Sequence, residues 1–229
     1  MKALVLFSGG LDSTTALALA VDKYGKDNVV ALSVSYGQKH LKEIEASNKI
    51  AAYYNVEHIY LDLSKIFEYS DCSLLSKNSD IDVPEGDYAK QLEQLNGAPL
   101  STYVPFRNGL FLSSAASIAI SKKCDIIYYG AHADDAAGEA YPDCSEEFTK
   151  AINEAIYLGS GKSVSVVGPF VNMHKSDIVA LGLKLHVPYE LTWSCYEGHD
   201  KACGRCGTCI DRKKAFLANG VKDPIEYEE

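Results

Sequence analysis

The sequence predicts an α/β protein with a mostly parallel sheet, helices on both faces of that sheet and a small C-terminal cysteine segment. Three observations support this class. Apolar runs alternate with amphipathic stretches through the first two-thirds of the chain, which is typical of βαβ units. The glycine pair Gly9 and Gly10 separates the first apolar run from an alanine-rich helical stretch, and four cysteines cluster between residues 195 and 209.

The strands are predicted from short apolar runs, several of them rich in β-branched residues. These runs cover residues 2–7, 29–35, 57–61, 125–129 and 164–167. Because each run is followed by a stretch with helical spacing or by a long connection, the strands are expected to lie parallel. We expect residues 1–190 to form this sheet domain and residues 191–229 to form a zinc segment packed on it.

The helices are predicted from apolar residues that recur at helical spacing, as Leu17, Ala20 and Val21 do in the first helix. The predicted helices cover residues 12–24, 40–54, 108–122, 145–158, 174–183 and 211–218. The polar stretch 69–101 is too long for a simple connection, so we interpret it as an active-site cover with a short helix at 88–96.

Length and composition indicate a globular protein with one main domain. The chain has 229 residues, of which 47% are hydrophobic and 23% charged. No apolar run approaches the roughly 20 residues of a membrane span, and residues 1–7 are too short for a signal peptide, so a cytoplasmic location is expected. The net charge of −9 argues against an extended basic surface that binds nucleic acid. It therefore favours a small-molecule substrate.

The junction after the first strand predicts a pyrophosphate-binding turn. The first turn of a helix leaves backbone N–H groups unpaired and carries the positive end of the helix dipole, and glycines let the backbone approach a phosphate. Hydroxyl groups add donors, and Asp12 could cap the helix or hold Mg²⁺. The spacing fits neither a Walker A loop nor a dinucleotide fingerprint, and an ordinary glycine turn is the alternative. The residues assigned to the nucleotide here are Phe7, Ser8, Gly9, Gly10, Leu11, Asp12, Ser13 and Thr14.

Further candidates lie near the carboxyl ends of other predicted strands or at helix starts, where open parallel sheets bind ligands. Tyr36 and Gln38 are placed to contact adenine or ribose, with ordinary loop structure as the alternative. Arg107 and Asn108 could bind a phosphate or a substrate carboxylate, and Lys175 is a weaker phosphate candidate, since both cations could equally be surface residues. Three aspartates, which could orient substrate donors, hold Mg²⁺ or cap helices, complete the set: Asp134, Asp135 and Asp143.

The cysteines divide into a cluster and three isolated thiols. Seven cysteines do not suit a closed disulfide framework, but Cys195, Cys203, Cys206 and Cys209 follow the spacing C-x7-C-x2-C-x2-C. Four thiolates around one ion favour a closed, structural Zn²⁺ site, with an iron–sulfur cluster as the rival. Cys72, Cys124 and Cys144 are scattered, and we interpret Cys144 as a packing or wall residue rather than a nucleophile.

The motifs resemble known families. The loop 8–13 is similar to the S-G-G-x-D-S loop of the ATP-pyrophosphatases, which implies the three-layer, adenine nucleotide alpha hydrolase-like (PP-loop) fold. The segments 192–196 and 202–209, together with Arg212, resemble the C-terminal signature of the 7-cyano-7-deazaguanine synthase family of queuosine biosynthesis. The resemblance continues, in order, through residues 7–15, 36–38, 101–104, 107–108 and 141–144. Phe106 stands where this family usually has Gly or Ala.

The resemblance implies a carbon–nitrogen ligase that converts 7-carboxy-7-deazaguanine, ammonia and ATP, with Mg²⁺, to the nitrile preQ0 through adenylated acid and amide intermediates. It implies catalytic or substrate-binding roles for Asp12, Ser13, Arg107 and Asp143. The alternatives are a tRNA thiolase, against which the acidic charge argues, and a nucleotide-sensing zinc regulator without catalysis. The sequence leaves the oligomeric state open, with a homodimer as one option.

Overall fold

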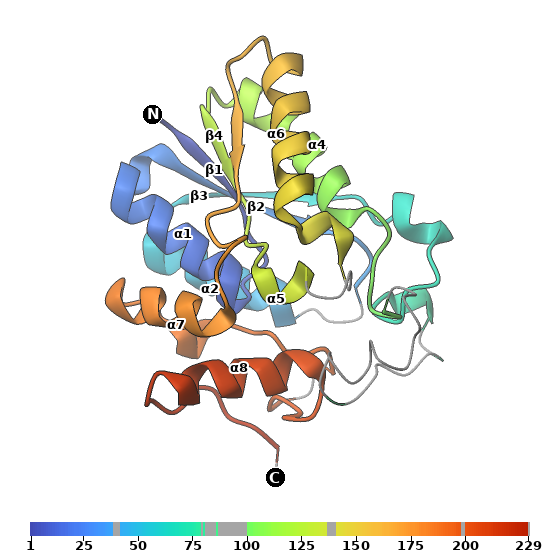
Figure 1. Ribbon diagram of the computed structural model, residues 1–229, viewed down its shortest axis with the longest axis vertical. Helices are drawn as coiled ribbons and strands as arrows, with labels where there is room; N and C mark the ends of the chain where they lie inside the picture. Colours follow the sequence, from blue (N-terminus) through green and yellow to red (C-terminus); the bar gives the residue numbers. More distant parts are fainter. Residues whose placement is uncertain are drawn as a thin grey trace.

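The structure is a computed structural model that describes residues 1–38, 42–78, 80, 86, 100–136, 141–197 and 200–228. Within these residues, five parallel strands form one sheet in the order β3-β2-β1-β4-β5 (Figure 1). The strands are β1 (Ala3–Leu6), β2 (Val29–Ser35), β3 (Glu57–Asp62), β4 (Ile126–Tyr128) and β5 (Ser165–Val167). The mostly parallel sheet predicted from the sequence is confirmed.

The central strand β1 is apolar throughout because both of its faces are covered. All four of its residues are buried, and Ala3 pairs with Val29 of β2 on one side and with Ile126 of β4 on the other. Alternate side chains point to opposite faces of a strand. Accordingly, Ala3 and Val5 belong to one core cluster, and Leu4 and Leu6 belong to the other.

Helices cover both faces of the sheet and give the molecule three layers (Figure 1). On one face, α1 (Leu11–Tyr24), α2 (Lys42–Tyr54) and α7 (Lys175–Lys184) share a core with β1 and β2, and α8 (Gly207–Ala218) packs against α7. On the other face lie α4 (Arg107–Ser121) and α6 (Glu146–Gly159). A short helix, α5 (Ala133–Ala136), follows β4. Short 3₁₀ turns span Lys26–Asn28, Ile66–Tyr69, Ser76–Asn78, Pro142–Cys144 and Tyr189–Leu191.

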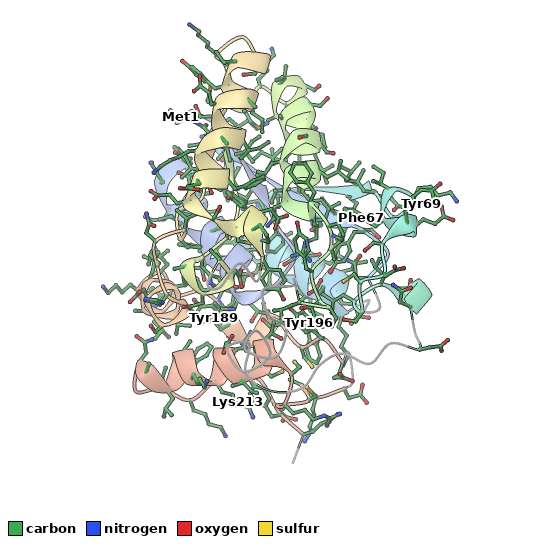
Figure 2. All side chains as sticks on the ribbon, turned by 45° about the vertical axis from the view of Figure 1, so that its right-hand side comes forward. Met1, Phe67, Tyr69, Tyr189, Tyr196 and Lys213 are labelled. Atoms are coloured by element: carbon green, nitrogen blue, oxygen red, sulfur yellow. The ribbon has the colours of Figure 1, made fainter. Side chains whose placement is uncertain are left out.

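The C-terminal segment shares the main core. Ala215 and Phe216 of α8 are buried in the same cluster as α1 and α7, and the ring of Phe216 lies 5.2 Å from that of Tyr189. Figure 2 shows Tyr189 and Tyr196 between the sheet domain and α8. The boundary that we expect at residue 190 is therefore crossed by a continuous core, and the division into two parts stays a prediction.

The predicted strands and six predicted helices are present, with most bounds shifted by one or two residues. The last helix begins at Gly207 rather than at residue 211, because the extended Cys206 already serves as its N-cap. Helix α5 and the 3₁₀ turns are too short to leave a periodic pattern and were missed. The start of the predicted helix 40–54 and the predicted helix 88–96 lie outside the described residues. No helix in the described ranges is long and apolar enough to span a membrane.

Candidate active site

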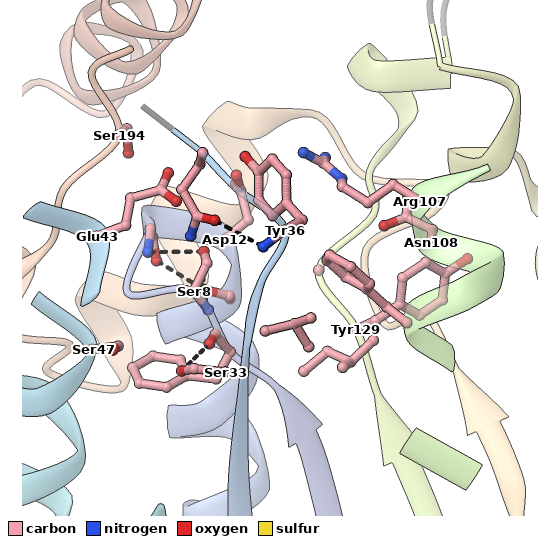
Figure 3. Close-up of a pocket in the computed structure, with 18 of the residues that line it drawn as sticks. Ser8, Asp12, Ser33, Tyr36, Glu43, Ser47, Arg107, Asn108, Tyr129 and Ser194 are labelled. Carbon is pink, nitrogen blue, oxygen red and sulfur yellow. Dashed lines mark hydrogen bonds between the residues drawn. The ribbon is translucent and has the colours of Figure 1, made fainter. Parts of the chain in front are cut away.

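A pocket opens at the carboxyl ends of β1, β2 and β4 (Figure 3). Its wall includes Phe7 and Ser8 after β1, Tyr36 after β2, and Tyr129 and Gly130 after β4. Strand β1 lies between β2 and β4, where the order of the strands in the sheet reverses direction relative to the chain. Open parallel sheets bind ligands at this position, so the pocket lies where the sequence placed the ligand site.

Residues 8–13, which we call the phosphate loop, form a closed turn at the start of α1. The Ser8 hydroxyl accepts a hydrogen bond from the Gly10 N–H at 3.2 Å, and the Ser8 N–H donates to Ser13 Oγ at 3.2 Å. Gly10, Leu11, Asp12 and Ser13 line the pocket. Because the first N–H groups of a helix have no acceptor within the helix and lie at its positive end, the loop can bind phosphate oxygens.

Two predicted loop residues support the turn from outside the pocket wall. Gly9 has a φ of +85°, and a Cβ there would lie 2.6 Å from the backbone nitrogen of Ser47 on α2. Only glycine fits this close approach. The Thr14 side chain is buried and donates to the Gly10 carbonyl at 2.7 Å. Both residues therefore support the shape of the turn. Their direct contact with a nucleotide stays a prediction.

Asp12 lies among titratable groups from other parts of the chain. Its Oδ2 is 3.3 Å from Lys175 Nζ at the start of α7 and 3.7 Å from His132 Nε2, which in turn lies 3.3 Å from Asp135 Oδ2. Burial lowers the pKa of Lys175, but the charges of Asp12 and Asp135 outweigh burial and raise it, so the lysine stays charged. Within the described part of the chain, Asp12 Oδ1 and His132 Nε2 are buried without a hydrogen-bond partner.

This cluster fits a magnesium polyphosphate. Mg²⁺ prefers carboxylate and phosphate oxygens, and the orphaned Asp12 Oδ1 is a free oxygen ligand beside the phosphate loop. The Lys175 ammonium beside it can neutralise phosphate charge. The structure therefore brings together Asp12 and Lys175, which lie far apart in the sequence.

Two aspartates from the predicted set lie at helix starts and do not line the pocket. Asp134 Oδ1 lies 2.6 Å from His174 Nδ1, and its Oδ2 accepts the Lys175 N–H at 2.8 Å, so Asp134 fixes the start of α7. Asp143 is 4% exposed, and its Oδ2 accepts the Asn108 N–H at 2.8 Å, which fixes the start of α4. Because Asp143 does not line the pocket, its direct contact with a substrate stays a prediction.

Arg107 and Asn108 line the wall opposite the phosphate loop (Figure 3). The Arg107 guanidinium lies 5.3 Å from the ring centre of Tyr36. Burial lowers the pKa of Arg107, but electrostatic interactions with Tyr36 and Asp143 outweigh this and raise it. Gln38 also lines the pocket, and its Oε1 accepts the Tyr36 N–H at 2.9 Å. The residues predicted to contact adenine, ribose or a carboxylate are thus gathered around one cavity.

Glu43 is a pocket residue that sequence reasoning missed. It stands in the first turn of α2, and its side chain points into the pocket (Figure 3). Burial raises the pKa of its carboxyl group to about 7, although the charge of Arg107 lowers it. An acidic residue in the first turn of a helix is common for electrostatic reasons alone, so the sequence carried no signal for it.

The four clustered cysteines form a buried group of sulfur atoms. Their Sγ atoms all lie within 4.8 Å of one another. The N–H groups of Glu197 and Cys203 point to Cys195 Sγ at 3.4 and 3.3 Å, and the Cys206 N–H points to Cys203 Sγ at 3.4 Å. Four convergent thiols that accept N–H groups fit a tetrahedral thiolate site, which is the chemistry of structural zinc.

The cysteine segment also forms part of the pocket wall, which the sequence did not indicate. Trp193, Ser194, Tyr196 and Thr208 line the cavity. The backbone N–H of Trp193 donates to the carbonyl of Gly9 at 3.0 Å, and Thr208 Oγ1 donates to the Ser194 carbonyl at 2.8 Å. A hydrogen-bonded path therefore joins the cysteine cluster to the phosphate loop.

Known proteins are similar to this chain over nearly its whole length. The family model "Queuosine biosynthesis protein QueC" matches residues 2–220. The chain belongs to the QueC family. Relatives named 7-cyano-7-deazaguanine synthase include a protein from Archaeoglobus fulgidus, 46% identical over 100% of this chain and 91% of that protein, and one from Pseudoalteromonas atlantica, 42% identical over 99% of each.

A solved structure shares the fold of this QueC family member. The NMN synthetase from Francisella tularensis superposes with a TM-score of 0.50 and 17% identity, covering 96% of this chain and 78% of that one. At this identity the likeness concerns the fold alone. It agrees with the predicted PP-loop class: a parallel sheet between helical layers, with the cysteine cluster as an addition at the C-terminus.

Proposed function

We propose that this protein catalyses the ATP-dependent conversion of 7-carboxy-7-deazaguanine and ammonia to 7-cyano-7-deazaguanine. The observation that carries the proposal is the match, over the whole chain, to relatives named for this product. The pocket adds independent support, since it combines a phosphate loop, a charged lysine and a carboxylate suited to Mg²⁺.

The chemistry requires activation of a carboxylate, which is a poor acyl electrophile. In the first half, a carboxylate oxygen attacks the α-phosphorus of ATP, pyrophosphate leaves into the phosphate loop, and ammonia displaces AMP to give the amide. In the second half, the amide oxygen attacks the α-phosphorus of a second ATP and a second pyrophosphate leaves. Loss of AMP and of the two N–H protons then gives the nitrile. Preorganised hydrogen-bond donors stabilise the negative charge that develops on the leaving pyrophosphate, and this lowers the activation barrier.

The residues divide by position in the pocket. Ser8, Gly10, Asp12 and Ser13 would hold pyrophosphate, with Lys175 neutralising its charge. Bound Mg²⁺ would neutralise phosphate charge beside Asp12. Tyr36 and Gln38 would contact the nucleoside, and Arg107 would contact the substrate carboxylate or its adenylate. No covalent enzyme intermediate is needed, and burial raises the pKa of the Cys144 thiol well above its ordinary value, which suits a packing role.

The four-cysteine site would hold Zn²⁺ as a structural ion. With four thiolate ligands the ion would have no open position for substrate, so its contribution would be to fix the segment that forms one wall of the pocket. Ammonia as the nitrogen donor, a homodimer and a cytoplasmic location remain predictions of the sequence.

The direct test is to incubate the zinc-loaded protein with ATP, Mg²⁺, ammonium and 7-carboxy-7-deazaguanine and to identify the products by mass spectrometry. Nitrile, AMP and pyrophosphate are expected. A folded protein that binds ATP but forms no nitrile would contradict the proposal and direct attention to other carboxylate or tRNA substrates.

A further inference from the structure

Glu43 lies beside the phosphate loop because its helix packs directly on that loop. A Cβ at Gly9 would lie 2.9 Å from the backbone carbonyl oxygen of Glu43, so the first turn of α2 is in contact with the turn that would hold the phosphates. The Glu43 side chain extends from this turn into the pocket, on the side opposite Arg107 (Figure 3). The Glu43 side chain therefore lines the same pocket as the phosphate loop and Arg107.

The other carboxylates that line the pocket already lie close to basic side chains. Asp12 lies 3.3 Å from Lys175 Nζ, and Asp135 Oδ2 lies 3.3 Å from His132 Nε2. The carboxylate of Glu43 has no hydrogen bond or ion pair with another described residue. Among the described carboxylates that line the pocket, Glu43 is therefore the one that makes no ion pair, and the free Asp12 Oδ1 is already suited to Mg²⁺.

The titratable groups around Glu43 come from several elements. Arg107 on α4 lowers the pKa of Glu43, and Tyr36, after β2, faces it as a neutral phenol whose own pKa is raised by burial. Lys42, the preceding residue, turns away, with its Nζ 4.6 Å from the ring centre of Trp193 and 3.7 Å from Asp200. Burial dominates, and it raises the pKa of Glu43 to about 7, a value suited to accepting and releasing protons at neutral pH.

The proposed reaction needs such a group. Ammonia brings hydrogen atoms on nitrogen, and the nitrile retains none of them, so every N–H proton must leave during the two halves of the reaction. The neighbouring Arg107 and Lys175 are charged and cannot accept a proton. Asp12 faces Lys175 and belongs to the phosphate loop, where it is suited to Mg²⁺.

We infer that Glu43 is the catalytic base that removes a proton from nitrogen as ammonia adds to the activated acyl carbon. The nitrogen lone pair forms the C–N bond, the C–O bond to AMP breaks, and AMP leaves with the bonding electron pair. The proton passes from nitrogen to the Glu43 carboxylate and then to solvent. This inference rests on the proposed function, since it names a residue for one step of that reaction.

The test compares Glu43→Gln with Glu45→Gln, a matched control on the exposed side of the same helix. Two rates are measured: nitrile formation, and exchange of labelled pyrophosphate into ATP that depends on the acid substrate and requires no ammonia. Because positioned proton transfer contributes about 10²- to 10⁴-fold, nitrile formation by Glu43→Gln should fall by that factor while exchange stays within about threefold. Glu45→Gln should leave both rates unchanged.

A pH profile gives a second readout. At a fixed concentration of free ammonia, nitrile formation by the wild type should rise through about pH 7 as Glu43 ionises, and the Glu43→Gln variant should lose this rise. Equal loss of exchange and nitrile formation would assign Glu43 to binding or structure, and nitrile formation within threefold of the wild type would exclude it as the base; either result overturns the inference. If the wild type forms no nitrile at all, the proposed function itself has failed, which is a separate outcome.

Discussion

Asp12 shows how much a single residue depends on the fold for its role. Its place in the loop predicted contact with Mg²⁺ or phosphate, but its basic neighbours, Lys175 and His132, come from α7 and from the segment after β4. Lys175 was a weak candidate in the sequence because a surface lysine explains it equally well, yet the fold buries it against Asp12. Glu43 could not be predicted, because its chemistry arises from burial, which a local pattern does not encode.

Replacement of Asp12 by Asn should abolish most activity without unfolding the protein. The substitution removes one negative charge beside Lys175 and a ligand suited to Mg²⁺, so nitrile formation should fall by at least about 100-fold. The melting temperature should change little. Asp22→Asn, on an exposed position of the same helix, is the control and should be as active as the wild type. Activity of Asp12→Asn within a few-fold of the wild type would rule out this role.

The start of α7 illustrates the element scale, since one aspartate outside that helix fixes it. Asp134 contacts the His174 side chain and accepts the Lys175 N–H. Burial raises the pKa of Asp134, but these hydrogen bonds outweigh it and lower the pKa, while the bond to Asp134 raises the pKa of His174. The Asp134 contribution is thus present above its ordinary pKa and lost in acid, and the His174 contribution is present below pH 6.5 and lost as pH rises through its raised pKa.

Asp134→Asn should therefore destabilise the protein most at pH values above the ordinary pKa of Asp134 and below the raised pKa of His174. We expect a loss of about 1 kcal/mol in the free energy of unfolding near pH 5.5, as is typical for helix N-terminal contacts, and a smaller loss at pH 9, because the His174 contribution is lost as pH rises through its raised pKa. Urea unfolding of wild type and variant at both pH values measures the difference. A loss that is larger at pH 9 than at pH 5.5 would contradict the assigned sign.

Helix α8 is held by a fully buried ion pair. The Arg212 guanidinium is 1% exposed and donates from Nε and Nη2 to Asp223 at 2.7 and 3.0 Å, and from Nη1 to Thr192 Oγ1 at 2.7 Å. It therefore joins α8 to the segment that enters the cysteine cluster. The sequence flagged Arg212 only through family resemblance, because a lone arginine in a helix carries no signal of burial.

Arg212→Ala should be strongly destabilising, because it leaves the Asp223 carboxylate buried without its partner. Removing one member of a buried pair costs about 3–5 kcal/mol. The loss should appear as a lower denaturation midpoint in urea at neutral pH. Lys213→Ala, one residue along the same helix, keeps the pair and should cost far less. Similar midpoints for the two variants would show that the pair is not a major stabilising contact.

At the scale of the whole molecule, the sequence predicted the sheet and the edge at which it binds ligands. It did not predict which distant segments together line the pocket. Apolar runs predict strands, and strands joined by helices predict a parallel sheet. No local sequence pattern indicates that the cysteine segment forms part of the pocket wall. This part of the wall arises because the backbone N–H of Trp193 donates a hydrogen bond to the carbonyl of Gly9, a residue far away in the sequence.

This connection predicts that metal loading and nucleotide binding are coupled. Removing the metal with a chelator, or replacing Cys206 by Ser, should lower the melting temperature and weaken ATP binding, because the Trp193 contact to the phosphate loop would lose its support. Calorimetry with and without added Zn²⁺ measures the affinity, and metal analysis shows whether zinc or iron is bound. Metal-free protein that binds ATP as tightly as the loaded protein would contradict the coupling.

The central claim is that one pocket activates first an acid and then an amide by transfer of AMP. The most direct measurement uses 7-carboxy-7-deazaguanine labelled with ¹⁸O at both carboxyl oxygens, with mass spectrometry of the nucleotide products. The account predicts two molecules of AMP for each nitrile, each carrying one ¹⁸O, because each carboxyl oxygen leaves on its own phosphate. Unlabelled AMP, or ADP in its place, would contradict the account.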